Sequence, residues 1–287
     1  MTASRRPPFD LLLQAPRALT ADLETWRQDS EAASVSEIRA VPPIYRLIRP
    51  ANPQDIAADI YEAGFDVGLI PRARRLHHLA VLAMDMDSTL ITIECIDEIA
   101  DMIGIKDQVA EITEKAMQGA IDFKESLTAR VALLKGIPVT ALDAVYDTRV
   151  NLSPGAEAML RKMRRAGVKT LLVSGGFTFF TERLKKKLKL THAVANELEV
   201  SDGKLTGRIV GDIVDAAAKA RALSAMKQQY VNEKRPLTAA IGDGANDLAM
   251  FMVSDISFAY HAKPKVREQA THAIDRCGLD AVLQYFN

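Results

Sequence analysis

The stretch "LAMDMDSTLITIECIDE", residues 82–98, decides the fold predicted for this chain, because a buried strand ends within it at two carboxylates. Asp85 and Asp87 follow the apolar run "LAVLAM" and are separated by one residue. Neighbouring carboxylates make each other harder to ionise, and a buried carboxylate is unfavourable unless another group compensates its charge. Two explanations remain open: either the strand end is solvated, or a cation lies between the two side chains.

Beyond residue 79 the sequence alternates apolar strands with amphipathic helices. Three more strands are predicted at 169–176, 237–244 and 255–260, and helices precede the first two of them at 156–167 and 215–230. Continuous apolar strands that alternate with helices are typical of a parallel sheet covered on both faces. The stretch "NELEVSDGKLTGRIVG" adds a predicted β-hairpin around Asp202 and Gly203. We therefore expect an α/β fold.

Two segments depart from this alternation. Residues 94–150 contain helix patterns and hardly any strand signal, so we expect a helical insertion over the carboxyl edge of the sheet, where open α/β folds bind ligands. Residues 1–75 mix strands, "FDLLLQA" and "EIRAVPPIYRLI", with helices that begin near the N-cap candidates Thr20 and Asn52. The basic stretch "RARRLHH" marks the boundary, giving a small N-terminal α+β domain at 1–75 and a catalytic domain at 76–287.

Composition excludes several classes of protein. The 287 residues contain 37 Lys and Arg against 37 Asp and Glu, so bulk charge predicts neither nucleic-acid nor membrane binding. Cys95 and Cys277 show no CxxC spacing, which indicates a reducing compartment without disulfides or a zinc site. The segment after Arg5 and Arg6 is too short and too polar for an export signal, and no stretch approaches the roughly 20 apolar residues of a membrane span. We expect a cytoplasmic protein; the sequence does not indicate its oligomeric state.

Polar residues lie at the ends of three of the predicted strands. They are Asp85 and Asp87 at the first, Ser174, Gly175 and Gly176 at the second, and Asp243, Asn246 and Asp247 at the third. Lys219 lies in the helix that leads into the third of these strands. In a parallel sheet these strand ends converge on one crevice.

The residue types at this crevice are those of a phosphate site. Asp85, Asp87 and Asp243 suit a hard cation such as Mg²⁺. The glycines beside Ser174 let backbone N–H groups approach an anion, and Lys219 supplies a positive charge for a phosphoryl oxygen. Each feature alone is ordinary, since aspartates cap helices and single lysines are mostly solvated. Their combination at three strand ends favours phosphate chemistry without a Walker A loop.

The motifs "DMDST", "SGG", Lys219 and "GDGANDLAM" resemble, in this order, the four motifs of the haloacid dehalogenase superfamily. The segments "ECIDEIA", "KAMQG", "FKESLTARVALLKG" and "LLVSGGF" are similar to cap and core segments of the members that hydrolyse phosphoserine. The resemblance covers residue 79 to the C-terminus. It implies a Rossmann-like core with an inserted helical-bundle cap at about 94–150, and Mg²⁺-dependent hydrolysis of L-phosphoserine, the last step of serine biosynthesis.

The resemblance also implies roles for the polar residues. Asp85 is the nucleophile that forms an aspartyl-phosphate. Asp87 donates a proton to the leaving serine oxygen and later accepts one from water, while its backbone carbonyl binds the metal. Asp243 completes the metal site and Asp247 orients a water on the metal. The residues implied to bind substrate or phosphate are Ser174, Gly175, Gly176, Lys219, Asn246, Glu94 and Arg130.

Recognition of the amino acid is expected from the inserted helices. Arg130 lies seven residues after Phe123 and shares a helix face with Leu127. It is interpreted either as a rim residue or salt-bridge partner, or as a bidentate clamp on a substrate carboxylate. The resemblance favours the clamp, and it implies Glu94 on the substrate ammonium. It also implies Met117 and Phe123 as apolar walls, although their pattern alone indicates core residues.

Two other functions compete with this hypothesis. A related capped phosphatase or phosphotransferase would act on another small phosphomonoester, such as phosphohomoserine. A binding or regulatory protein would keep the fold without turnover, but the complete set of acidic residues and Lys219 argues against it. For the N-terminal segment, a ligand-sensing module, a spacer and an oligomerisation surface all remain open.

Overall fold

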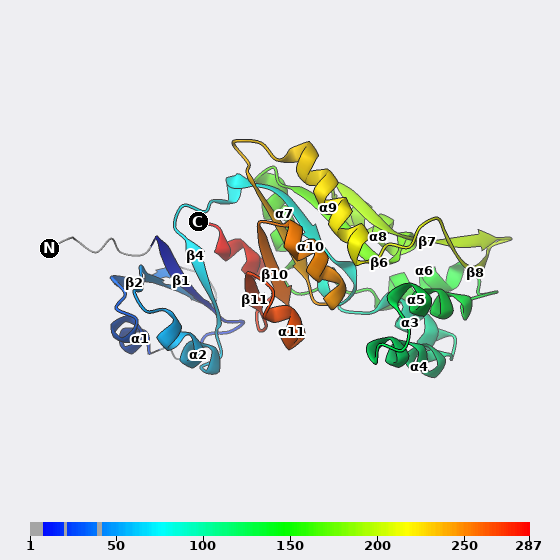
Figure 1. Cartoon of the computed structure of the whole chain (residues 1–287), viewed down its shortest axis with the longest axis horizontal. Helices are drawn as coiled ribbons and strands as arrows, with labels where there is room; N and C mark the ends of the chain where they lie inside the picture. Colours follow the sequence, from blue (N-terminus) through cyan, green and yellow to red (C-terminus); the bar gives the residue numbers. More distant parts are fainter. Residues whose placement is uncertain (1–7, 20–21, 39–41) are drawn as a thin grey trace.

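The structure is a computed structural model that describes residues 8–19, 22–38 and 42–287. It contains two β-sheets, one of four strands near the N-terminus and one of seven strands that forms the centre of the molecule. A group of helices lies at the end of the molecule farthest from the N-terminal sheet (Figure 1). Arg5, Arg6 and Thr20, together with residues 39–41 of the predicted "EIRAVPPIYRLI" strand segment, lie outside the described residues.

The N-terminal sheet is antiparallel and has the strand order β2-β3-β1-β4. Its strands are β1 (Phe9–Gln14), β2 (Ser34–Ile38), β3 (Ile44–Ile48) and β4 (Asp66–Pro71), and its helices are α1 (Leu23–Asp29) and α2 (Gln54–Glu62). One face packs on these helices around Trp26 and Phe65. The other face contributes Leu12 and Ile70 to the large core of the central unit. Strand β1 at its centre is therefore buried on both faces, whereas the edge strand β2 stays partly exposed.

Three details of this unit differ from the sequence predictions. The segment "EIRAVPPIYRLI", predicted as one strand, contributes to two antiparallel strands, β2 and β3, because its ends pair with each other. Helix α2 begins after Pro53, and Asn52 donates its side-chain amide to Glu31 at 3.2 Å instead of capping the helix. Strand β4 was not predicted, because Gly68 and Pro71 lower its strand propensity. Gly68 is needed there for packing, since a Cβ at this position would lie 2.5 Å from the ring of Tyr285.

The central sheet has the strand order β11-β10-β9-β5-β6-β7-β8. All neighbouring pairs are parallel except β7 and β8, which form the predicted hairpin. The predicted parallel α/β fold is thus confirmed. The strands are β5 (Leu79–Met84), β6 (Lys169–Phe177), β7 (His192–Ser201), β8 (Lys204–Val210), β9 (Leu237–Gly242), β10 (Ile256–Tyr260) and β11 (His272–Ile274).

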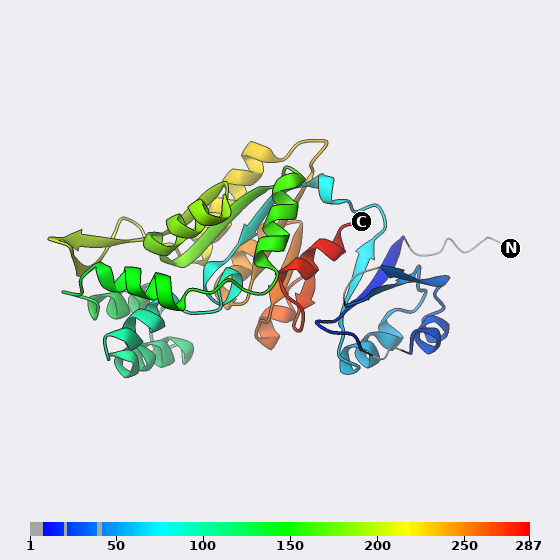
Figure 2. The same ribbon diagram turned by 180° about the vertical axis from the view of Figure 1, so that it is seen from behind.

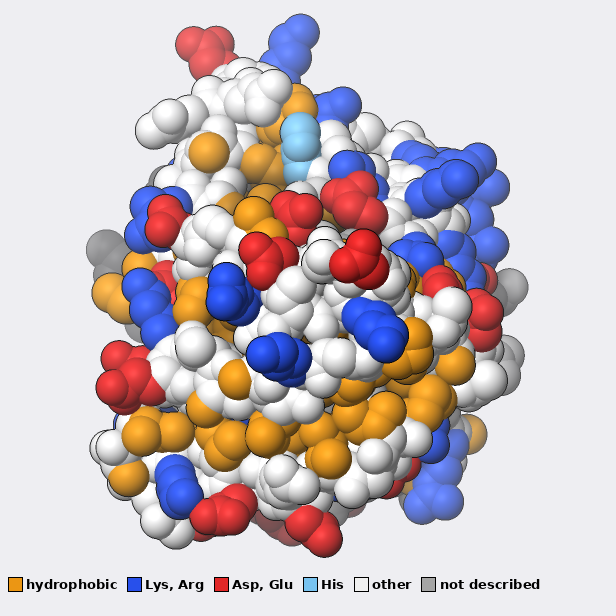
Figure 3. Space-filling view, turned by 90° about the vertical axis from the view of Figure 1, so that its right-hand side faces the viewer, with side chains coloured by type: hydrophobic (Ala, Val, Ile, Leu, Met, Phe, Trp, Pro, Cys, Tyr) orange, Lys and Arg blue, Asp and Glu red, His pale blue; other side chains and the backbone are white. Residues whose placement is uncertain are grey.

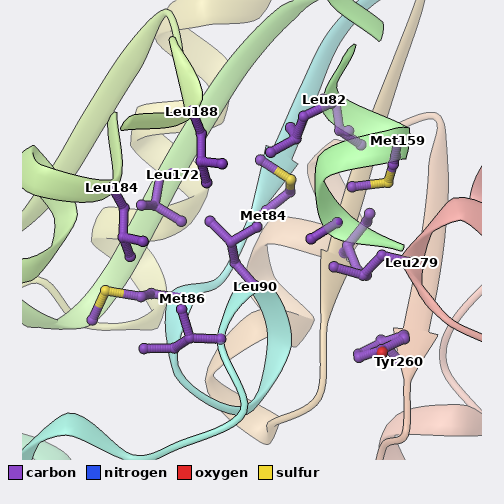
Figure 4. Packing of buried hydrophobic residues seen from close by; sticks show 14 of the residues in the cluster. Leu82, Met84, Met86, Leu90, Met159, Leu172, Leu184, Leu188, Tyr260 and Leu279 are labelled. Carbon is purple, nitrogen blue, oxygen red and sulfur yellow. The ribbon is translucent and has the colours of Figure 1, made fainter. Parts of the chain in front are cut away.

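Helices cover both faces of this sheet (Figure 2). One face holds α7 (Ala156–Arg165), α8 (Thr178–Leu188) and the short helical segment η4 (Leu279–Tyr285), and the other holds α9 (Ala216–Tyr230), α10 (Leu248–Val253) and α11 (Pro264–Arg267). Leu82 and Met84 of β5 lie among Met159, Leu172 and Leu184 in the first layer (Figure 4). The apolar strand "LAVLAM" is buried along its whole length because both layers cover it.

The predicted helical insertion forms a cap between β5 and α7. Its helices are α3 (Cys95–Met102), α4 (Lys106–Met117), α5 (Phe123–Ala132) and α6 (Thr140–Arg149). The β7–β8 hairpin extends to the cap, where Leu205 accepts the Gly136 N–H at 2.8 Å and Gly203 accepts the Val139 N–H at 2.9 Å. The end of the molecule seen in Figure 3 carries interspersed charges of both signs and a band of apolar side chains.

The two units are joined by buried polar contacts. The Asp66 carboxylate, at the start of β4, accepts the backbone N–H groups of Asp275, Arg276 and Cys277 at 2.9 to 3.2 Å. We propose a domain boundary between residues 75 and 76, because β4 ends at Pro71 and β5 begins at Leu79. Cys95 and Cys277 are both buried and unpaired. Among the described helices, none combines the length and apolar character of a membrane span.

Candidate active site

Three strand ends meet under the cap. In the sheet register Met84 of β5 pairs with Leu172 of β6 and with Ile241 of β9, so the carboxyl ends of these strands lie side by side. They open into a cavity of about 220 Å³. Ten of the residues predicted for the site line it, namely Asp85, Asp87, Glu94, Phe123, Arg130, Ser174, Gly175, Gly176, Asp243 and Asn246. The sequence did not indicate four others, which are Ile96, Leu127, Phe177 and Gly244.

The chain leaves β5 through an irregular turn, η2 (Met86–Leu90), in which Asp87 has an extended backbone and Ser88 a left-handed one. Asp85 begins this turn and accepts the Met86 N–H at 2.7 Å. The Asp87 carboxylate accepts the Cys95 N–H at the start of the cap at 2.9 Å and the Ser174 hydroxyl at 3.2 Å. Asp85 is thereby held by the core, whereas Asp87 bridges the core and the cap.

Lys219 is the only cation that the structure places against Asp85 among the described residues. Its ammonium lies 2.6 Å from Asp85 Oδ2 and 2.8 Å from Asp247 Oδ1, and its side chain is 1% exposed. Burial alone would lower the pKa of Lys219, but the two carboxylates outweigh it and raise the pKa. Lys219 therefore stays charged and fixes one side of the site.

The acidic side chains of the site hold more negative charge than Lys219 balances. Burial, followed by the charge of Asp85, raises the pKa of Asp87 to about 6 and that of Asp247 to about 7. Burial and the charge of Asp87 raise the pKa of Glu94 to about 8. Burial and Asp85 also raise the pKa of Asp243. A site with this excess of carboxylates favours a cation, a proton, or both.

One group of carboxylates has the arrangement of a metal site. Asp85, Asp243 and Asp247 each present an oxygen within 4.8 Å of the others. The Thr89 hydroxyl donates to Asp243 at 2.9 Å and orients it. Asp87 was expected in the carboxylate cluster on the strand-end pattern, but the structure groups Asp247 there instead. The reason is that the Cys95 and Ser174 bonds turn the Asp87 side chain toward the cap and β6.

A second part of the cavity carries one acidic side chain, Glu94, and one cationic side chain, Arg130, from the cap. The Ser88 hydroxyl donates to Glu94 at 2.7 Å, and Arg130 donates weakly to the Ser126 carbonyl at 3.4 Å. Within the part of the chain that the structure describes, no carboxylate lies within 4 Å of Arg130. This finding does not support the salt-bridge interpretation, and it leaves the guanidinium available to a ligand in the cavity.

The two predicted apolar walls differ in position. Phe123 lines the cavity, and a Cβ on Gly175 would lie 2.9 Å from its ring. Met117 is not in the cavity: it is the last residue of α4 and is 66% exposed. The prediction that Met117 forms a wall is therefore not met in this structure, because the end of α4 points that side chain toward solvent.

The glycines after Ser174 allow a close approach to Asp87. A Cβ on Gly176 would lie 2.7 Å from Asp87 Oδ2, so a larger residue would displace the acid. The Gly176 N–H donates to Ser174 Oγ at 2.8 Å, which fixes the hydroxyl. Asn196 and Thr89 support this region and were not identified from the sequence. The position of Thr89 within the motif "DMDST" could have indicated a role in the site. For Asn196 the sequence offers only its position in the predicted hairpin.

Comparisons with known proteins agree with this geometry. A family model of haloacid dehalogenase-like hydrolases matches residues 82–252. The phosphoserine phosphatase of Polaromonas sp. (strain JS666) is 51% identical over 73% of this chain and 91% of its own length. That of Albidiferax ferrireducens is 44% identical over 82% of this chain and 99% of its own length.

Solved structures show the same likeness. A probable phosphoserine phosphatase from Vibrio cholerae has a TM-score of 0.82 and 35% identity, covering 99% of this chain and 88% of that chain. A substrate-bound phosphoserine phosphatase complex has a TM-score of 0.66 and 36% identity, covering 73% of this chain and 99% of that chain. The first likeness includes the N-terminal sheet, since it extends over nearly the whole chain.

Proposed function

The chain belongs to the haloacid dehalogenase-like hydrolases, in the branch of the phosphoserine phosphatases, and from this premise we propose that it hydrolyses O-phospho-L-serine to L-serine and phosphate. One observation carries the choice of substrate. The cavity that contains Asp85 is also lined by a carboxylate, Glu94, and by an Arg130 guanidinium without an ion-pair partner among the described residues. The Arg130 guanidinium would bind the carboxylate of an amino acid, and Glu94 would bind its ammonium, a cation that favours the ionised form of Glu94.

In this proposal Asp85 attacks the phosphorus atom of the substrate. A bond forms between its carboxylate oxygen and phosphorus as the bond from phosphorus to the serine oxygen breaks. Asp87 gives its proton to the departing serine oxygen, and its raised pKa of about 6 supports this role. Asp87 then takes a proton from the water that attacks the aspartyl-phosphate, which releases phosphate and restores Asp85. Lys219, Ser174 and the Gly175–Gly176 backbone hold the phosphoryl oxygens, with Asn246 beside them.

The proposed cofactor is Mg²⁺. Asp85, Asp243 and Asp247 fit a hard cation, because their oxygens lie within 4.8 Å of one another and carboxylates are preferred ligands of such ions. The Asp87 backbone carbonyl is the further proposed ligand. When bound, Mg²⁺ would neutralise the repulsion between the Asp85 carboxylate and the phosphate. We place this reaction at the last step of serine biosynthesis, in the cytoplasm.

The metal-free protein is expected to become less stable as the pH rises from 5 to 8. The pKa of Glu94 is raised from 4.5 to about 8 and that of Asp247 from 3.8 to about 7, so the folded state holds protons that the unfolded state releases. The contribution of Glu94 and Asp247 to the free energy of unfolding is therefore fully present below the pKa values that they have in the unfolded chain. It is lost as the pH rises through the pKa values that they have in the folded protein. Melting temperatures measured by circular dichroism at several pH values test this expectation.

Two comparisons make this melting experiment specific. Mg²⁺ should raise the melting temperature most at the alkaline end, because it favours the ionised carboxylates. Glu94→Gln keeps the shape of the side chain but does not titrate, so its melting temperature should depend less on pH. A melting temperature that rises with pH in the metal-free wild type, with no response to Mg²⁺, would contradict the proposed site.

Arg130→Ala is expected to reduce turnover of phosphoserine far more than turnover of phosphoethanolamine, which has the ammonium but no carboxylate. A charge-assisted hydrogen bond contributes roughly 1.5–3 kcal/mol, so the loss in kcat/KM on phosphoserine should be about 10- to 150-fold. The test is phosphate release from both substrates, with and without Mg²⁺, by wild type and variant.

Arg130→Lys serves as the matched variant in this assay. It should restore only part of the activity on phosphoserine, because lysine supplies charge without the planar fork. Equal proportional losses of Arg130→Ala on both substrates would remove Arg130 from substrate binding. Wild-type preference for phosphohomoserine over phosphoserine would assign the site to a different phosphomonoester.

A further inference from the structure

Asn196, on strand β7, connects two backbone segments through its side-chain amide. The residue is 1% exposed and does not line the cavity. Its Nδ2 donates to the Gly175 carbonyl at 2.7 Å, and its Oδ1 accepts the Val214 N–H at 2.8 Å. Because the Gly175 carbonyl is an acceptor and the Val214 N–H a donor, these contacts also determine the positions of Nδ2 and Oδ1 in the amide.

The first contact acts on the Ser174 hydroxyl through a single peptide group. The Gly175 carbonyl and the Gly176 N–H belong to the same planar trans peptide, so they point in opposite directions. With the carbonyl bound by Asn196, the N–H donates to Ser174 Oγ at 2.8 Å. That hydroxyl donates in turn to Asp87 at 3.2 Å. Asn196 therefore sets the orientation of a peptide on which the Ser174 hydroxyl depends.

The second contact acts on the helix that carries Lys219. Val214 directly precedes Asp215, whose carboxylate caps α9 by accepting the Ala218 N–H at 2.8 Å. Lys219 follows in the first turn of this helix and reaches Asp85 at 2.6 Å. One buried amide is thus bonded to the strand end of Ser174 and to the start of the helix of Lys219.

We infer that Asn196 is a positioning residue for the phosphate part of the site, acting on Ser174 and Lys219 without touching the substrate. This inference rests on the proposed function. The cap residues Glu94 and Arg130 belong to other segments, and none of the Asn196 contacts involves them. Loss of Asn196 should therefore weaken phosphate binding and the phosphoryl-transfer step while leaving recognition of the amino-acid part unchanged.

The experiment measures kcat and KM for phosphoserine and the inhibition constants of inorganic phosphate and of L-serine. Asn196→Leu, an apolar residue of similar size, should raise the inhibition constant of phosphate by about tenfold, since a displaced group loses much of its hydrogen bonding. It should lower kcat by on the order of 10²-fold, as misplacement of about 1 Å does in other enzymes. The inhibition constant of L-serine should stay at the wild-type value.

Thr170→Val is the matched control for lost stability. The Thr170 hydroxyl accepts the Thr191 N–H at 3.0 Å near the opposite end of β6, so this variant also removes a buried polar contact beside β6. It should lower the melting temperature without changing the inhibition constant of phosphate. If Asn196→Leu does not fold, Asn196→Asp replaces it, because aspartate still accepts the Val214 N–H and loses the donor to Gly175.

Two kinds of result obtained with an active wild type would overturn the inference. One is an unchanged phosphate inhibition constant in folded Asn196 variants of an active wild type, which would leave the proposed function intact. The other is an equal rise in the inhibition constants of phosphate and L-serine. A rise in the phosphate inhibition constant of Thr170→Val equal to that of the Asn196 variants has the same meaning, because either result would show that the substitution perturbs the whole structure and not the phosphate part of the site. Absence of phosphoserine hydrolysis by the wild type would overturn the proposed function and this inference with it.

Discussion

Asp85→Asn is expected to abolish phosphate release from phosphoserine, with a loss on the order of 10⁶-fold, as removal of a nucleophile causes in other covalent enzymes. An amide nitrogen or oxygen does not replace the carboxylate as a nucleophile toward phosphorus. The fold should remain intact, because the asparagine oxygen still accepts the Met86 N–H and Lys219 keeps Asp247 at 2.8 Å. Removing one of several crowded carboxylates also relieves repulsion on Asp87 and Asp247.

Three measurements check this result. Acid-quenched wild-type enzyme should retain labelled phosphate on the protein, whereas Asp85→Asn should retain none. The melting temperature of the variant should be at least that of the wild type. Asp202→Asn is a suitable control with full activity, because Asp202 lies in the exposed hairpin turn at φ 51°, a conformation that asparagine also adopts. Turnover by Asp85→Asn close to the wild-type rate would rule out the aspartyl-phosphate route.

Asp87→Asn is expected to slow turnover of phosphoserine by on the order of 10²–10⁴-fold, the usual contribution of general acid–base catalysis. The serine oxygen is a poor leaving group without a proton, and Asp87 is the buried acid whose pKa of about 6 lets it hold one near neutral pH. The asparagine oxygen can still accept the Cys95 N–H, so the contact with the cap should persist.

The leaving group separates this chemical role from a structural one. p-Nitrophenol leaves without needing a proton, so Asp87→Asn should still form the phosphoenzyme rapidly from p-nitrophenyl phosphate. Breakdown of that phosphoenzyme should then be slow, because the attacking water lacks its base. A burst of p-nitrophenol followed by slow turnover would show both effects. Equal losses on both substrates, with no accumulated phosphoenzyme, would mean that Asp87 only supports the fold.

The sequence could indicate which residues line the candidate site because neighbouring parallel strands end at one edge of the sheet. Asp85, Ser174 and Asp243 lie within a few residues of strand ends, so sheet register alone brings them together. The cap helices were predicted for a similar reason, since their apolar faces repeat with helical spacing. In both cases a local pattern determines the position of the side chain.

Predictions failed where tertiary contacts decide the outcome. Asn196 gains its importance from the Gly175 carbonyl and the Val214 N–H, two backbone groups without any signature in side-chain patterns. Met117 belongs to a helix with an apolar face, but its place at the last turn of α4 exposes it. Strand β4 contains a glycine that a strand disfavours and that the distant Tyr285 ring requires.

The hydrogen bonds from the backbone N–H groups of residues 275–277 to the Asp66 carboxylate have a consequence for the order in which this protein folds during synthesis. The backbone groups that satisfy Asp66 are made 209 to 211 residues after it. The Tyr285 ring, which covers Gly68, is made later still. The β1–β4 sheet thus emerges from the ribosome with one face, including Leu12 and Ile70, lacking its counterpart. Nascent chains expose such surfaces to chaperones and to aggregation until the partner segment arrives. We therefore expect the β1–β4 sheet to dock late in folding, after residues 275–285 have been made.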